Sequence, residues 1–150
     1  MRIVLFEPEI PPNTGNIARL CAATETPLHL IEPLGFSVDD KHLKRAGLDY
    51  WPHVNVVVHP NFEHFITSIQ PSRLVMATTK ASTAHHVFQF EPDDAIVMGP
   101  ETRGLPDSML ERSDHRVRIP IWGQVRSLNL STATGILLYE ALRQTDLIPS

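Results

Sequence analysis

The sequence predicts one α/β domain built on a parallel β-sheet with helices on both faces. Short runs of β-branched and aliphatic residues alternate with stretches in which apolar residues recur at helical spacing. The runs at 74–77 and 95–98 are apolar at nearly every position, as in strands that helices cover on both sides. A chain of 150 residues is long enough for one hydrophobic core and too short for two, so we expect a single domain over 1–150.

The predicted elements follow one another in a regular order. Residues 2–6 form the first buried strand, and after a Pro-rich turn a helix begins at Thr14, with Asn13 or Thr14 as its cap. The elements that follow are strand 28–31, a short basic helix capped by Asp39 or Asp40, strand 54–58, helix 62–69, strands 74–77, 95–98 and 117–120, and a last helix at 128–143. That last helix buries Leu130, Thr134, Leu137, Leu138 and Ala141.

The composition predicts a cytoplasmic protein. Hydrophobic residues make up 42% and charged residues 20% of the chain, which is usual for a soluble domain. No apolar run approaches the ~20 residues that cross a bilayer, and the N-terminus lacks a signal-peptide pattern. The single cysteine, Cys21, cannot form an internal disulfide, which suits a reducing compartment. Its place on the apolar stripe of the first helix predicts a small core residue.

The net charge of −4 means that any RNA site must be a local basic patch. Lys41, Lys44 and Arg45 offer one, because on a helix Lys41 would neighbour both of the others. Such a run is also typical of a solvated helix face. The composition therefore permits an RNA partner without indicating one.

Polar segments at 13–19, 99–105 and 126–131 adjoin the ends of predicted strands, where open α/β sheets bind ligands. A dinucleotide-binding loop needs closely spaced glycines after the first strand, and that turn holds only Gly15, so a Rossmann oxidoreductase is disfavoured. Gly99 and Gly104 would let a ligand approach the main chain and let the loop fold back. A plain turn in which Glu101 pairs with Arg103 is the competing interpretation.

Ser127 and Asn129 stand at the predicted start of the last helix. Either side chain could cap that helix, and free backbone groups there could hold an adenine or a carboxylate. One of the two can cap while the other binds, so both interpretations stay open.

Three segments in this order resemble the motifs of the SPOUT class of RNA methyltransferases. They read NTGNIAR at 13–19, MGPETRGL at 98–105 and SLNLS at 127–131. The stretches EPEIPPNTGN at 7–16 and RAGLDY at 45–50 are similar to one branch, the tRNA (cytidine/uridine-34 2′-O)-methyltransferases. The resemblance covers essentially the whole chain.

The resemblance implies a C-terminal deep trefoil knot, which general rules of chain topology would have argued against. It also implies a homodimer formed through the first and last helices, with both subunits contributing to each active site. In such a dimer Ala18, Ala22 and Ala133 would pack between subunits.

The resemblance further implies S-adenosyl-L-methionine as the cofactor and S-adenosyl-L-homocysteine as the product. The residues that match the cofactor-binding positions of the family are Ala77, Thr78, Gly99, Glu101, Gly104, Ile119, Ile121, Ser127 and Leu128. The residues that match its catalytic positions are Arg19, Asn13, Glu101, Ser127 and Asn129. A guanidinium rarely gives up its proton. Arg19 therefore either acts as the base in an unusually perturbed site, or it orients the phosphate and polarises the ribose 2′-hydroxyl.

The implied substrate is the anticodon stem-loop of tRNA, methylated at the wobble nucleotide 34. Candidate phosphate contacts are Lys41, Lys44, Arg45, Arg103 and Arg126. Tyr50 and Trp51 could stack on an anticodon base, or they could pack against the sheet edge or the second subunit. The adjacent pair His85 and His86 has poor spacing for metal ligands, so we expect no metal. Methylation of another tRNA position or of ribosomal RNA, and a silent RNA-binding module, remain alternatives.

Overall fold

We analysed a computed structural model that describes residues 1–39, 41, 45 and 48–150. Six strands form one sheet in the order β3-β2-β1-β5-β4-β6, and every neighbouring pair is parallel. The strands are β1 (Arg2–Phe6), β2 (Leu28–Ile31), β3 (Val56–His59), β4 (Arg73–Ala77), β5 (Asp94–Met98) and β6 (Arg116–Val117). The predicted parallel α/β sheet is confirmed.

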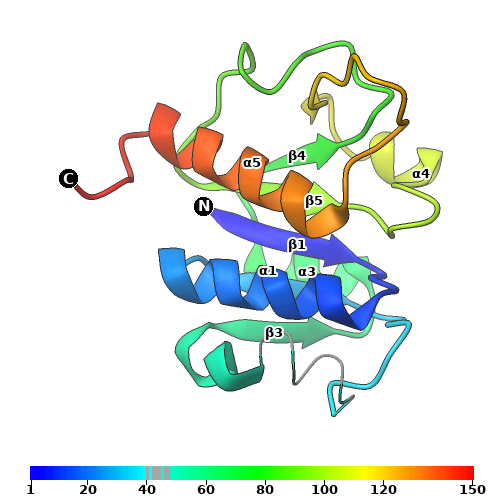
Figure 1. The fold of residues 1–150 in the computed structure, drawn as a ribbon, viewed down its shortest axis with the longest axis vertical. Coiled ribbons are helices and arrows are strands. Elements are labelled where there is room, and N and C mark those ends of the chain that lie inside the picture. The colour runs from blue at the N-terminus through cyan, green and yellow to red at the C-terminus, as the bar shows by residue number, and fades with distance from the viewer. Residues whose placement is uncertain (40, 42–44, 46–47) are drawn as a thin grey trace.

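Helices cover both faces of this sheet (Figure 1). The helices α1 (Pro11–Thr24) and α5 (Leu130–Gln144) lie on one face with the 3₁₀ helix η1 (Leu48–His53), and α3 (Phe62–Ile69) and α4 (Asp107–Leu110) lie on the other. Alternate residues of β1 show the two layers, since Ile3 and Leu5 join the α1/α5 core and Val4 joins the α3/α4 core. The five residues predicted for the buried face of the last helix are all buried.

Several predicted element ends are wrong. Helix α1 begins at Pro11 and is preceded by Ile10, because Pro11 and Pro12 occupy the first turn, where a missing N–H costs nothing. Strand β3 covers Val56–His59 and not 54–58, since the Val54 N–H donates to the Trp51 carbonyl in the preceding turn. The predicted strand at 117–120 is only the two residues Arg116 and Val117. The short helix α4 was not predicted.

The last helix begins at Leu130 and not at 128, because Asn129 caps it by accepting hydrogen bonds from the N–H groups of Ser131 and Thr132. The predicted caps Asp39 and Asp40 cannot be compared in full, because Asp40 lies outside the described residues, as does Lys44 of the predicted basic patch. In the described part of the chain, no helix is long and apolar enough to cross a membrane.

The chain after β6 runs alongside the loop that follows β4. Ala84 and Arg118 form an isolated parallel bridge, and the His85 N–H donates to the Arg118 carbonyl at 2.8 Å. This contact brings the segment that leads to α5 next to a loop some thirty residues earlier. The trefoil knot itself stays a prediction.

Candidate active site

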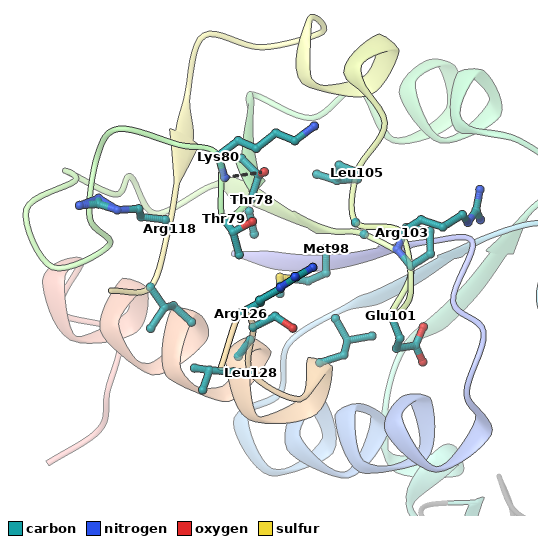
Figure 2. A pocket seen from close by; sticks show the side chains of 18 of the residues that line it. Thr78, Thr79, Lys80, Met98, Glu101, Arg103, Leu105, Arg118, Arg126 and Leu128 are labelled. Carbon is teal, nitrogen blue, oxygen red and sulfur yellow. Dashed lines mark hydrogen bonds between the residues drawn. The ribbon is translucent and has the colours of Figure 1, made fainter. Parts of the chain in front are cut away.

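A cavity of about 290 Å³ opens at the carboxyl ends of β4, β5 and β6. Its walls are the loops at 77–80, 98–105, 117–121 and 126–128, and residues of α5 complete the lining. Figure 2 shows these loops converging on one hollow, with Met98 and Leu128 turned into it. A concave pocket at this edge of a parallel sheet is where α/β enzymes bind small molecules.

The loop at 98–105 folds back tightly on itself. A Cβ atom at Gly99 would lie 2.4 Å from the Leu105 nitrogen and 2.6 Å from the Gly104 carbonyl carbon, so only glycine is accommodated. Gly104 has a φ of +68°, which other L-residues rarely adopt, and its N–H donates to the Pro100 carbonyl at 2.8 Å. The fold-back that the two glycines predicted is therefore confirmed.

The Glu101 carboxylate ties this loop to the start of α1. It accepts hydrogen bonds from the N–H groups of Glu9 and Ile10, both at 2.8 Å, and from Asn13 Nδ2 at 3.2 Å. Asn129 Nδ2 in turn donates to Asn13 Oδ1 at 3.0 Å. One chain of hydrogen bonds thus joins all three segments that the sequence singled out.

A second carboxylate, that of Glu9 in the turn before α1, binds the loop at 98–105 in the opposite direction. Glu9 accepts hydrogen bonds from the Thr102 N–H at 2.9 Å and from the Thr102 hydroxyl at 2.7 Å, and these bonds lower the pKa of Glu9. Arg103 pairs with Glu7 at 3.1 Å, so the proposed pairing of Arg103 with Glu101 is replaced by two separate contacts. The loop and the turn before α1 are therefore joined at several points.

The residues that line the pocket carry a net positive charge, whereas the chain as a whole is negative. Among the described residues that line it, four are cationic and Glu101 is the one acid, whereas the whole chain has a net charge of −4. The cations are Lys80, Arg103, Arg118 and Arg126. Lys80 and Arg103 pair with acids outside the lining, at 3.4 and 3.1 Å. Because Glu101 accepts hydrogen bonds from backbone N–H groups, Arg118 and Arg126 set the local potential, which favours an anionic ligand.

All nine residues expected to hold the cofactor line this one pocket. Ser127 is free to do so because Asn129 provides the helix cap. Of the expected catalytic residues, Glu101 and Ser127 line the pocket, and Asn13 and Asn129 reach it through their hydrogen bonds. Arg19 does not line it and lies on the exposed side of α1.

The expected RNA contacts separate into two groups. Arg103 and Arg126 line the pocket, whereas Lys41 and Arg45 are exposed and lie outside its lining. Sequence reasoning missed Lys80 and Arg118. Their positions in the sequence could have identified them, since each residue follows a strand that ends at the pocket.

Three other sequence interpretations can be compared with the structure. Cys21 is fully buried in the core, and burial raises the pKa of its thiol to about 12, so the prediction of a core residue is confirmed. Trp51 packs against the core, which favours the second of its two interpretations. Within the described residues, no group of three or more His, Cys, Asp or Glu side chains is arranged to hold a metal ion.

A pocket bounded by main-chain loops at the carboxyl edge of a parallel sheet defines an α/β enzyme that acts with a small molecule. Residues 1–139 match the SpoU rRNA Methylase family, and the chain belongs to this family. The resemblance to RNA methyltransferases that three sequence motifs indicated is therefore confirmed.

Similar proteins span nearly the same length. A tRNA (cytidine(34)-2'-O)-methyltransferase of Methylovorus glucosotrophus is 53% identical over 146 residues, covering 96% of this chain and 95% of that protein. One of Escherichia coli K12 is 49% identical, covering 96% and 93%. A solved structure described as giving insights into the 2-OH methylation of C/U34 on tRNA has a TM-score of 0.91 and 45% identity, covering 95% and 94%.

An AdoMet-bound rRNA methyltransferase from Sinorhizobium meliloti has a TM-score of 0.85 and 26% identity. It is similar to 95% of this chain, which corresponds to 55% of that longer protein. The fold of this chain is thus shared with enzymes whose names give different RNA substrates.

Proposed function

We propose that this protein transfers a methyl group from S-adenosyl-L-methionine to the ribose 2′-hydroxyl of nucleotide 34, a cytidine or a modified uridine, in the anticodon loop of tRNA. The main support is that all nine residues expected to hold the cofactor line one pocket. The chain is also about half identical to enzymes named for this reaction.

The pocket suits this cofactor in shape and chemistry. Ile119, Ile121 and Leu128 provide apolar surface for an adenine, and the fold-back at Gly99 presents main-chain groups that can read its edge. Main-chain N–H groups and the cations of the lining suit the carboxylate of the methionine moiety. When bound, the cofactor supplies an electrophilic methyl group, and the protein has to orient the hydroxyl and exclude water.

The hydrogen-bond chain through Glu101, Asn13 and Asn129 holds the pocket walls in position. Glu101 uses both carboxylate oxygens on α1 and the turn before it, so we assign it the task of fixing the loop at 98–105. Asn13 and Asn129 link that loop to the start of α5. These three are positioning residues in the proposed mechanism.

Arg19 is the proposed group that acts on the substrate. A guanidinium rarely gives up its proton, so we propose that Arg19 donates hydrogen bonds to the ribose hydroxyl or its phosphate and stabilises the negative charge that develops on the oxygen as the hydroxyl proton passes to solvent. Its position on the exposed side of α1, outside the lining of the pocket of its own chain, favours a homodimer in which Arg19 of one subunit serves the pocket of the other.

The exposed side of α5 supports that assembly, since it carries Ile136 and Tyr139 at 37% and 49% exposure next to α1. The small residues named for the interface need one correction. Ala18 is fully buried in the core of its own chain and cannot face a partner.

The test is transfer of labelled methyl from S-adenosyl-L-methionine to tRNA isolated from cells that lack this activity, followed by digestion to nucleosides. We expect label in a 2′-O-methylated nucleoside at position 34. Label at another tRNA position or in ribosomal RNA would overturn the substrate, and cofactor binding without transfer to any RNA would favour the silent RNA-binding module. In Arg19→Ala, transfer should be lost while tRNA binding stays measurable.

A further inference from the structure

The two tryptophans of this chain occupy opposite environments. Trp51 packs against the core beneath α1, whereas Trp122 is 92% exposed, more than any other large apolar side chain among the described residues. An indole offers a large rigid face at little cost in conformational entropy, which suits recognition. Trp122 directly follows Ile121 of the pocket lining, so an extended partner bound at the pocket passes close to it.

Cations without acidic partners flank the loop that carries Trp122. Arg126 ends the loop and, within the described part of the chain, makes no ion pair. Arg118 precedes the loop, and its side chain donates a hydrogen bond from Nη1 to the Ser82 carbonyl at 3.2 Å, which leaves its positive charge uncompensated. Figure 2 shows Arg118 extending outward from the rim and Arg126 extending over the mouth of the pocket.

This combination is specific for one kind of partner. Proteins bind single-stranded nucleic acid by stacking bases on aromatic side chains and by placing cations on the adjoining phosphates. A partner that buries only apolar surface would leave two guanidinium groups dehydrated and unpaired, which is costly. The charge around Trp122 therefore fits a polyanion with exposed aromatic bases.

We propose that Trp122 stacks on an unpaired RNA base next to the methylated nucleotide, with Arg118 and Arg126 on the flanking phosphates. This inference rests on the proposed function, because it takes the bound polyanion to be the RNA substrate. It assigns Trp122 to substrate positioning: the stacked base fixes where the reacting ribose enters the pocket. Trp122 has no part in holding the cofactor.

The test compares steady-state methylation of tRNA by wild type and by Trp122→Leu and Trp122→Phe. We expect the leucine variant to raise the KM for tRNA by about five- to a hundredfold, the range for losing one base–aromatic stack. The phenylalanine variant keeps an aromatic face and should stay within about threefold of wild type. The affinity for S-adenosyl-L-methionine, measured by calorimetry without RNA, should be unchanged in both.

The matched control is Val125→Ser, which removes an apolar side chain of 63% exposure from the same loop without touching an aromatic face. It should leave the KM for tRNA at the wild-type value. Intrinsic fluorescence gives a direct signal, since a stacked base quenches an indole. Titration with an anticodon stem-loop should quench the emission of wild type and leave that of Trp122→Phe, which retains Trp51 alone, nearly constant.

The outcomes separate this inference from the proposed function. If wild type methylates tRNA but Trp122→Leu keeps the wild-type KM, the stacking role is overturned and the proposed function stands. Weaker cofactor binding in Trp122→Leu would make Trp122 a cover of the cofactor, and a changed sedimentation coefficient would make it a subunit contact; either result overturns the inference. If wild type transfers no methyl to RNA, the proposed function fails first.

Discussion

At the edge of the sheet where β4 and β5 begin, Arg73 lies against a carboxylate with no solvent exposure. Asp94 accepts hydrogen bonds from Arg73 Nε at 2.7 Å and Nη2 at 2.8 Å, and the Glu91 N–H donates to the same carboxylate at 2.8 Å. At the opposite edge, where β4 and β6 end, Arg118 and Arg126 have no carboxylate partner among the described residues.

The same side chain therefore has two different tasks in one sheet. A buried carboxylate needs a cation beside it, so the charge of Arg73 is compensated by Asp94 and stabilises the fold. Arg118 and Arg126 at the pocket keep their charge available, at little cost in stability because water solvates it. The difference separates the edge that holds the molecule together from the edge that binds.

The largest effect on stability should follow from removing the buried acid. Asp94→Asn leaves Arg73 beside a neutral amide, and we expect the free energy of unfolding to fall by about 3–5 kcal/mol. Denaturant titration measures this change. The affinity of the folded fraction for the cofactor should stay at the wild-type value, because the pocket lies at the other edge.

The control for Asp94→Asn is Glu91→Gln. Glu91 also pairs with Arg73, at 3.3 Å, but its side chain is 62% exposed, and we expect a loss below about 1 kcal/mol. Equal losses in the two variants would contradict the distinction between buried and solvated pairs on which the comparison depends.

A chain of hydrogen-bonded histidines lies in the other half of the sheet. Arg2 Nη1 lies 2.9 Å from His29 Nε2, His29 Nδ1 lies 3.0 Å from His59 Nε2, and His59 Nδ1 lies 2.9 Å from His64 Nδ1. A guanidinium can only donate, so His29 must accept at Nε2 and donate at Nδ1, and His59 must do the same. The chain forms only while these rings are neutral.

Acid should therefore destabilise this half of the molecule. Burial first, then the charge of Arg2 and of His59, lowers the pKa of His29 from 6.5 to about 4. Because the unfolded chain takes up the proton first, the stabilisation is complete above pH 6.5 and is lost as the pH falls toward 4. The shift corresponds to about 3 kcal/mol, measurable as the free energy of unfolding against pH.

Two variants sharpen the pH prediction. His29→Leu should reduce the pH dependence between 6.5 and 4, because one of three histidines with a lowered pKa is gone. His53→Gln changes an exposed histidine outside this chain of rings and should leave the dependence as in wild type. A slope in His29→Leu as steep as that of wild type would assign the effect to other groups.

The histidine chain also shows what the sequence could not predict. Strands 2–6 and 28–31 were predicted with their observed ends, since each is a short apolar run that stops at a charged or proline-rich turn. His29, His59 and His64 come from β2, β3 and α3, and nothing in their spacing indicates that β2 and β3 are neighbours. Contacts between elements depend on strand order, which periodicity does not reveal.

The candidate site was predictable to the extent that its residues adjoin strand ends. Gly99 and Ser127 could be placed because the carboxyl ends of parallel strands share one edge. Arg118 was missed because β6 ends at Val117, three residues before the predicted end at 120, so Arg118 was assigned to a strand and not to a pocket loop. The partners of Glu101 are mostly backbone N–H groups, and residue types carry no information about those.

A smaller loss should follow from changing the acid that fixes the pocket wall. Glu101→Gln places an NH₂ group where two backbone N–H groups now donate, and we expect the free energy of unfolding to fall by about 1–3 kcal/mol. Cofactor affinity should fall as well, because the loop at 98–105 lines the pocket. Calorimetry and denaturant titration measure the two quantities. An unchanged cofactor affinity would remove Glu101 from the positioning role.

The smallest effect on stability should come from the open edge. Arg126→Gln removes an exposed cation without an ion pair in the described part of the chain, so unfolding should change by less than about 0.5 kcal/mol. The binding of tRNA should weaken, and the slope of log K against log salt should fall by about one unit, since one phosphate contact is lost.

The matched control for Arg126→Gln is Arg112→Gln, which removes a cation paired with Glu63 and packed over the Phe62 ring, away from the pocket. That variant should keep the wild-type salt dependence of tRNA binding. If both variants lower the slope equally, RNA binding reflects charge spread over the whole surface. If only Arg126→Gln lowers it, the unpaired cations at the carboxyl edge act as a localised RNA contact, as their difference from Arg73 implies.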